Sequence, residues 1–200
     1  MEIAVNGVDG VGKSTFINAA LFHFERAEIR VSVIDLPYFR RTHGFSWISP
    51  YLAACGEWVE MRSRFLFATF MVSMAMLFLF ARWRTQRAQQ VVIVEHHPRI
   101  AMIPYALLYG GRFGLLLASA VRTFWPKPDY LILLTADPRE SRRRVVSRGR
   151  RMQWRQSAER LLLLQQQHML EAVKELPRNC IGVNISASKL LESLKAAKLL

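Results

Sequence analysis

The chain has few cysteines, and their placement argues against a disulfide scaffold and against a cysteine metal centre. Only Cys55 and Cys180 occur among its 200 residues, and they are too far apart for the paired spacing of metal ligands. His96 and His97 are adjacent, which is poor spacing for two ligands on one helix. A chain of this length buries enough apolar surface to fold without disulfides. We therefore expect two free thiols in a reducing compartment, the cytoplasm.

Acidic residues are also scarce. The chain has 15 Asp and Glu against 28 Lys and Arg, a formal net charge of +13. Such an excess favours polyanionic partners, which are nucleotides, nucleic acid or an anionic membrane. A secretory signal peptide is not expected, because the acidic Glu2 stands near the start and a strand-like run follows at once.

The one long apolar run is slightly short for a membrane span. Residues 65–81 are 17 positions without a charge, flanked by Arg64 and Arg82. A span needs about 20 such residues, and this run also contains Thr69 and Ser73. We expect a buried central helix within residues 57–90, with a membrane contact as the less favoured alternative.

The most informative motif lies at residues 7–15, which read GVDGVGKST and match the P-loop pattern GxxxxGK[ST] in full. A strand-like run at 2–6 precedes it and a helix-like run at 16–25 follows, as the motif requires. Backbone N–H groups of the loop and the helix N-terminus can cradle phosphates, while Lys13 reaches the β- and γ-phosphates and Ser14 ligands Mg²⁺. The motif predicts ATP and Mg²⁺ as ligands. The residues expected to contact the nucleotide are Gly7, Asp9, Gly10, Val11, Gly12, Lys13, Ser14 and Thr15.

Strand-like and helix-like segments alternate along the rest of the chain, which predicts an α/β fold. We expect one domain, residues 1–200, with the P-loop NTPase three-layer sandwich: a five-stranded parallel sheet with helices on both faces and a basic lid at about 149–156. The ligand should lie beyond the carboxyl ends of the strands. The expected strands are 3–5, 30–34, 91–94, 130–134 and 180–185. The expected helices are 13–27, 57–90, a segment within 104–122, 138–149, 157–175 and 187–199.

Two acidic residues follow expected strands at this edge. Glu95 is positioned to organise Mg²⁺ or to accept a proton from the phosphoryl acceptor. Asp35 is the weaker candidate, for a water on Mg²⁺ or for the acceptor. Either residue could instead be an ordinary polar side chain at a strand end. Residues 36–50, which follow Asp35, are the best candidate for a mobile loop.

Arginine is concentrated near the expected lid. Eight arginines fall within 17 residues, and four of them are spaced by four, three and four, so a continuous helix would align them on one face. Such a row could neutralise charge during phosphoryl transfer, although most charge runs are solvated surfaces. The aligned residues are Arg144, Arg148, Arg151 and Arg155.

The motifs together resemble thymidylate kinases and their deoxynucleoside-kinase relatives. The P-loop GVDGVGKST is similar to theirs, and residues 128–150 resemble a family segment of strand, Asp-Pro turn and arginine-bearing helix. Residues 91–97 resemble the buried strand that ends in an acid, and 183–188 the final strand and loop beside the adenine. The resemblance implies an ATP-dependent kinase for a nucleoside monophosphate or nucleoside, with dTMP as the first candidate. It also implies that Arg144 and Arg148 act in catalysis with Lys13 and Glu95.

The resemblance places the acceptor beside two further segments. The aromatic and basic loop at 37–47 lies where related kinases close on the acceptor, so Phe39 and Arg40 are candidates for stacking a base and holding a phosphate. Residues 109–115 are similar to an acceptor loop, which makes Arg112 a further candidate. A homodimer through the apolar helix at 57–90 would also fit the resemblance.

Two departures from the family pattern concern the acceptor pocket. The acid Glu95 is followed by His96 where the family has arginine, and Arg99 is the nearest substitute. The preceding helix carries Met71 and Met74 where an acceptor-facing arginine is usual. The alternatives are therefore a kinase with a less polar, non-nucleotide acceptor, or a nucleotide-regulated module that binds nucleic acid or anionic membrane. Nucleic acid is not favoured as a partner, because a nucleotide ligand already accounts for the positive charge.

Overall fold

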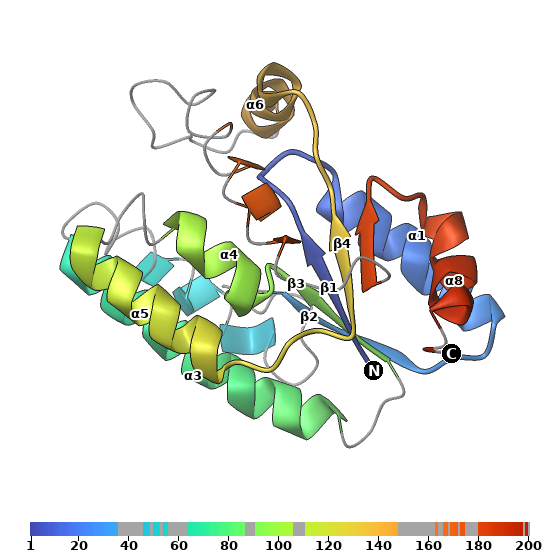
Figure 1. Ribbon diagram of the computed structural model, residues 1–200, viewed down its shortest axis with the longest axis horizontal. Helices are drawn as coiled ribbons and strands as arrows, with labels where there is room; N and C mark the ends of the chain where they lie inside the picture. Colours follow the sequence, from blue (N-terminus) through green and yellow to red (C-terminus); the bar gives the residue numbers. More distant parts are fainter. Residues whose placement is uncertain are drawn as a thin grey trace.

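A five-stranded parallel sheet, in the order β2-β3-β1-β4-β5, forms the centre of the computed structural model (Figure 1). The strands are β1 (Glu2–Asn6), β2 (Val31–Asp35), β3 (Val91–Glu95), β4 (Tyr130–Leu133) and β5 (Ile181–Val183). All five expected strands are confirmed, and so is their parallel pairing. The structure describes residues 1–35, 46–48, 50–52, 54–55, 64–86, 91–105, 111–147, 163, 166–167, 169–171, 173–174, 180–197 and 199.

The strands are short and apolar because both faces of the sheet are covered. Successive residues of β1 belong alternately to the hydrophobic cores on the two faces of the sheet. Ile3 and Val5 lie in the core beneath α1 (Lys13–Arg26) and α8 (Ala187–Ala196). Ala4 lies in the core of the opposite face, with Ile100 of α4 (Pro98–Tyr105). The three-layer α/β arrangement is thereby confirmed.

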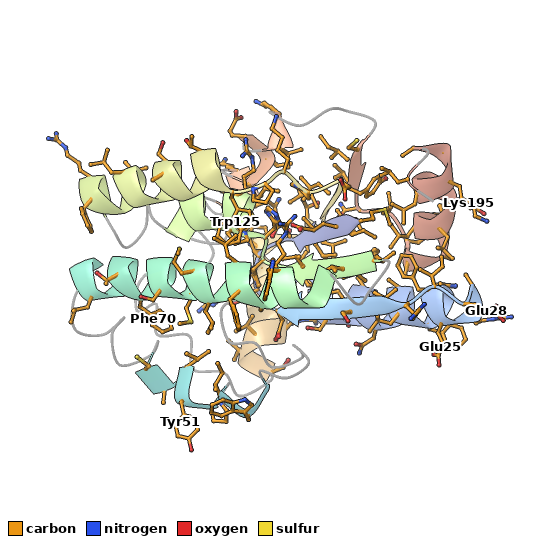
Figure 2. The ribbon with its side chains drawn as sticks, turned by 90° about the horizontal axis from the view of Figure 1, so that it is seen from below. Glu25, Glu28, Tyr51, Phe70, Trp125 and Lys195 are labelled. Carbon is orange, nitrogen blue, oxygen red and sulfur yellow. The ribbon has the colours of Figure 1, made fainter. Side chains whose placement is uncertain are left out.

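Two long helices extend to one side of the sheet. Helices α3 (Arg64–Gln86) and α5 (Gly111–Phe124) contact each other along their length and lie side by side in both views (Figures 1 and 2). The expected helix at 57–90 is confirmed for its described part. Within the described part of the chain, no helix has both the length and the hydropathy of a membrane span.

The segment before α5 differs from its expected form. The helix expected within 104–122 is found as α5, whereas α4 at Pro98–Tyr105 was not expected. Helix α4 begins at Pro98, where a proline fits the first turn, and Pro104 lies one residue before its last residue, Tyr105.

Helix α6 (Pro138–Ser147) lies beyond the carboxyl edge of the sheet (Figure 1). As expected, it starts at the Asp137-Pro138 turn, where the Asp137 carboxylate accepts the N–H of Arg139 at 2.7 Å. The described residues between 163 and 173 are helical, in agreement with the expected helix at 157–175. The lid at 149–156 lies outside the described residues, and so does most of the loop at 36–50.

Candidate active site

The P-loop connects the central strand β1 directly to α1. Gly10 and Gly12 adopt φ angles of 83° and 102°, a region that side chains disfavour. A Cβ on Gly10 would lie 2.3 Å from the Ser141 carbonyl oxygen, so the loop passes directly against α6. Gly12 caps α1 without a side chain, which leaves the first turn of the helix shaped for an anion.

The ammonium group of Lys13 is buried inside this loop. Its Nζ donates hydrogen bonds of 2.9 Å to the carbonyl oxygens of Gly7 and Val8. Asp9 Oδ1 lies 3.6 Å from the same nitrogen, as an ion pair. The loop therefore holds its cation in place, at the N-terminal end of α1, where phosphates are expected.

Asp35 and Glu95 lie next to each other at the carboxyl ends of β2 and β3. They are register partners, and their side chains are 8% and 9% exposed. Val33 and Ile93, two residues earlier, belong to the α1-side core, so both carboxylates are on the face that α1 covers. Ser14 lies in the first turn of α1, the helix that covers that face. These are oxygen donors of the kind Mg²⁺ takes from proteins, one or two carboxylates completed by water and phosphate.

No group of three or more His, Cys, Asp and Glu side chains converges as a metal site in the described residues. A Mg²⁺ site of the kinase type does not need such a group, because it retains waters and uses substrate phosphates. The hydroxyl of Ser14 and the two carboxylates therefore fit this ion, and their ligand role stays a prediction.

Arg144 reaches the P-loop from α6. Its Nη1 donates to the Gly10 carbonyl oxygen at 3.4 Å, while its Nε donates to Glu140 Oε1 at 2.8 Å. Hydrogen bonds from Arg143 and Arg144 hold the pKa of the half-buried Glu140 below its ordinary 4.5. Glu140 thus aims the guanidinium of Arg144 toward the loop.

A cavity of about 600 Å³ opens between the P-loop and α6. Its volume is within the range of small-molecule sites. It combines apolar walls with one cation, a combination suited to the base and sugar of a nucleotide whose phosphates lie in the loop. The lining residues are Val11, Gly12, Thr15, Phe16, Leu134, Arg144 and Ser147.

The structure does not bring the expected acceptor residues together at one described site. Arg99, in the first turn of α4, donates from Nη1 to the Trp125 carbonyl oxygen at 3.0 Å, and Figure 2 shows Trp125 near the middle of the molecule. Arg112 is exposed in the first turn of α5. Arg148, Arg40 and Phe39 lie outside the described residues.

A buried charged cluster on the α4-covered face of the sheet was not expected from the sequence. Glu2 Oε1 accepts a 2.8 Å hydrogen bond from His97 Nε2, and Glu2 Oε2 accepts one from Arg82 Nε. Burial by itself raises the pKa of Glu2, but His97 and Arg82 lower it by more and leave it below 4.5. Burial lowers the pKa of His97 below 6.5 despite the bond to Glu2, so the ring is neutral at pH 7 and donates from Nε2. An acid inside an apolar strand was the available signal.

Comparison with known proteins agrees with the motifs. The profile of the thymidylate kinase family matches residues 5–196. A search of curated protein sequences gives no match. Among solved structures, the chain is similar to deoxyadenosine kinase from M. mycoides, determined with the products dCMP and a flexible dCDP bound. That likeness has a TM-score of 0.61 and 15% identity, and it covers 100% of this chain and 96% of the other.

A structural likeness at this identity shows the fold, whereas the family match spans nearly the whole chain and includes the P-loop. The loop also has the backbone conformation and the buried lysine of a nucleotide-binding site. The chain therefore belongs to the thymidylate kinase family and is a P-loop nucleoside or nucleotide kinase.

Proposed function

We propose that the protein transfers the γ-phosphoryl group of ATP to a nucleoside monophosphate or a nucleoside, with dTMP as the first candidate acceptor. The observation that carries this proposal is the position of the P-loop. The Lys13 ammonium lies within it, and Asp35 and Glu95 end the two neighbouring strands on the α1 side of the sheet. The family match supports a nucleotide or nucleoside as acceptor.

In the proposed reaction an acceptor oxygen attacks the γ-phosphorus in line with the oxygen that bridges the β- and γ-phosphorus atoms. The bond to that bridging oxygen breaks, and ADP leaves. Lys13 exchanges the carbonyl oxygens of Gly7 and Val8 for phosphate oxygens, and Arg144 adds positive charge from α6. For a hydroxyl acceptor, Glu95 is positioned to take the proton. Ser14 with Asp35, and with Glu95 where it takes no proton, would hold Mg²⁺, which would supply neutralisation of the phosphate charge.

A less polar acceptor is the second candidate, favoured by one observation. The guanidinium of Arg99, the nearest substitute for the family's missing arginine, donates to a backbone carbonyl of Trp125. While Arg99 makes that bond, the exposed Arg112 of α5 is the other described candidate for the cation that a nucleoside monophosphate would use. An acceptor without a phosphate would not need it.

The test measures ATP consumption with Mg²⁺ across a panel of nucleosides, nucleoside monophosphates and uncharged alcohols. Lys13→Ala should abolish turnover, whereas Lys189→Ala, which removes an exposed lysine from α8, should not alter it. Turnover with one nucleotide or nucleoside names the acceptor. Tight ATP binding with no nucleotide-dependent turnover would contradict the first proposal, and turnover with an uncharged alcohol would establish the second.

The salt dependence of activity and binding distinguishes both kinase proposals from a nucleotide-regulated module that binds nucleic acid or anionic lipid. Binding through phosphate contacts weakens steeply as salt rises, whereas acceptor-dependent turnover through Lys13 need not. Retention on nucleic acid or anionic vesicles that is lost at high salt, without turnover, would favour the module.

A further inference from the structure

The turn after β3 has an unusual backbone. His96, which directly follows Glu95, adopts φ = 59°, the left-handed region that residues with a Cβ disfavour. Its N–H donates to the Val5 carbonyl oxygen at 3.1 Å, which continues the pairing of β3 with β1. The next residue, His97, is then directed into the protein interior. Some other interaction must stabilise this turn.

His97 is fixed at both its backbone and its ring. Its carbonyl oxygen accepts the N–H groups of Ile100 at 3.0 Å and Ala101 at 2.9 Å, which starts α4. Its ring is 0% exposed and donates from Nε2 to Glu2 Oε1 at 2.8 Å. The segment that follows Glu95 is therefore tied to the first residue of β1.

Glu2 connects this segment to α3. The side chain is 1% exposed, and its second oxygen accepts the Nε–H of Arg82. A buried carboxylate is stabilised only while such partners remain, because an uncompensated buried charge is strongly destabilising. Glu2 lies on the face of the sheet that α4 covers, since Ala4 belongs to that core. Glu95 lies on the opposite, α1-covered face, so the cluster does not touch the reacting groups.

We propose that Glu2, His97 and Arg82 are positioning residues that hold the left-handed turn after Glu95. They thereby fix the Glu95 carboxylate and the first turn of α4, with Arg99, relative to the P-loop. This rests on the proposed function for its kinetic consequence, but the geometric part does not require turnover. The P-loop is connected to the other end of β1, so ATP binding should depend little on the cluster.

The first test compares His97→Ala with His97→Gln. The alanine removes the ring that bonds Glu2, whereas the glutamine keeps an N–H donor. With the acceptor named by the panel above, His97→Ala should lower kcat by about tenfold to a hundredfold, the usual effect of losing a group that orients a ligand. The KM for ATP should stay unchanged, the Mg²⁺ concentration for half-maximal rate should rise, and His97→Gln should recover most of the loss.

A second substitution tests the turn itself. If the cluster acts by holding His96 at positive φ, then His96→Gly should partly restore kcat in the His97→Ala protein, because glycine adopts this conformation readily. Asp129→Ala is the matched control. It removes the carboxylate that accepts the Glu2 N–H at 2.7 Å but leaves the Glu2 side chain in place, and it should leave kcat unchanged. Arg82→Gln replaces His97→Ala should the latter not fold.

Hydrogen exchange gives a readout that does not depend on activity. Amides of residues 95–101 should exchange faster in His97→Ala, or in Arg82→Gln in its place, than in the unchanged protein, with α8 unaffected. Unchanged exchange there overturns the inference whatever the activity. If the unchanged protein turns over no acceptor, the proposed function fails, while the exchange result still decides the positioning role. A loss of kcat matched by an equal rise in the KM for ATP, or no rescue by glycine at 96, would also overturn it.

Discussion

Asp35 and Glu95 occupy the same register position on adjacent parallel strands, and both are buried. Neighbouring strands are about 4.8 Å apart, so the two carboxylates project from almost the same point of the sheet edge. Two carboxylates this close can contact one divalent cation together, because Mg²⁺ in proteins is bound by one or two carboxylates completed by water and phosphate. The pair therefore favours a cation at this edge, next to the start of α1.

The first prediction concerns this pair. Glu95→Gln should lower kcat by about a hundredfold and raise the Mg²⁺ concentration for half-maximal rate, because an amide oxygen lacks the charge that binds the ion. Asp35→Asn should shift the Mg²⁺ dependence with a smaller effect on kcat. Steady-state rates across a Mg²⁺ titration measure both. Glu192→Gln, an exposed change on α8, is the control, and an unchanged Mg²⁺ midpoint in both test variants would contradict the assignment.

The second prediction uses two glycines of the P-loop. Both have positive φ, so alanine should cost about 1 kcal/mol of stability at either position. Only at Gly10 would the new Cβ meet backbone, 2.3 Å from the Ser141 carbonyl oxygen, whereas nothing lies within 4 Å at Gly12. Gly10→Ala should therefore lower the free energy of unfolding by at least about 1 kcal/mol more than Gly12→Ala does.

Urea unfolding of the two glycine variants measures this difference, and equal losses would disprove the close approach of loop and α6. The same pair also separates stability from binding. The Cβ at Gly12 would project toward the cavity beside the loop, which Gly12 lines. Gly12→Ala should therefore weaken ATP binding even though it unfolds at higher urea than Gly10→Ala.

The P-loop, the strands and the order of elements could be predicted because they depend on local patterns. GVDGVGKST specifies its own backbone, and short apolar runs between helical segments specify buried parallel strands. The start of α4 could not be fixed in the same way. Pro98 and Pro104 both match the signal for a first helical turn, and only the carbonyl of His97, which accepts the N–H groups of Ile100 and Ala101, shows which proline opens the helix.

The Glu2 cluster could not be predicted for a different reason. Arg82 and His97 are 80 and 95 positions away from Glu2 in the sequence, and no local pattern pairs the three residues. Glu2 alone gave a signal, as a charge in an apolar strand, and it was interpreted only as an acidic N-terminus. The acceptor roles of Phe39 and Arg40 and the catalytic role of Arg148 stay predictions, because these residues lie outside the described part of the chain.

The third prediction follows from the lowered pKa values of Glu2 and His97. His97 is faced by Glu2, Arg82 and Arg99, and Glu2 by His97 and Arg82. As the pH falls below 6.5, the unfolded chain protonates His97 while the folded ring stays neutral. Below 4.5 the unfolded chain protonates Glu2 while the folded carboxylate stays ionised. In both pH ranges the unfolded state binds more protons than the folded state. The free energy of unfolding should therefore decrease as the pH is lowered.

Urea unfolding between pH 7 and pH 4 measures this dependence. His97→Gln removes the imidazole and keeps a donor to Glu2, so the loss of stability that begins near pH 6.5 should shrink, while the loss below pH 4.5 should remain. A pH profile identical to that of the unchanged protein would show that His97 does not contribute.

Helix α3 presents a regular exposed stripe on one side. Leu66, Met76, Phe80 and Trp83 are exposed large apolar side chains, and the rings of Phe80 and Trp83 stack at 6.2 Å. Together with the exposed Thr69 and Ser73 they are spaced by three, four, three, four and three residues. This spacing is the a/d pattern of a helix that packs against another helix. On the neighbouring α5, Phe113, Leu115 and Leu116 are also exposed.

The fourth prediction is that a second copy of the chain covers this stripe. We favour a second copy over lipid because the a/d spacing is that of a helix–helix seam, which accommodates the small hydroxyl residues Thr69 and Ser73. Sedimentation in detergent-free buffer should give a dimer, and the double change Met76→Glu with Phe80→Glu should give a folded monomer. Phe22→Glu on α1 is the matched control, because Phe22 is 56% exposed and Met76 is 63% exposed. This variant should remain a dimer. Sedimentation of the unchanged protein as a monomer would contradict this prediction.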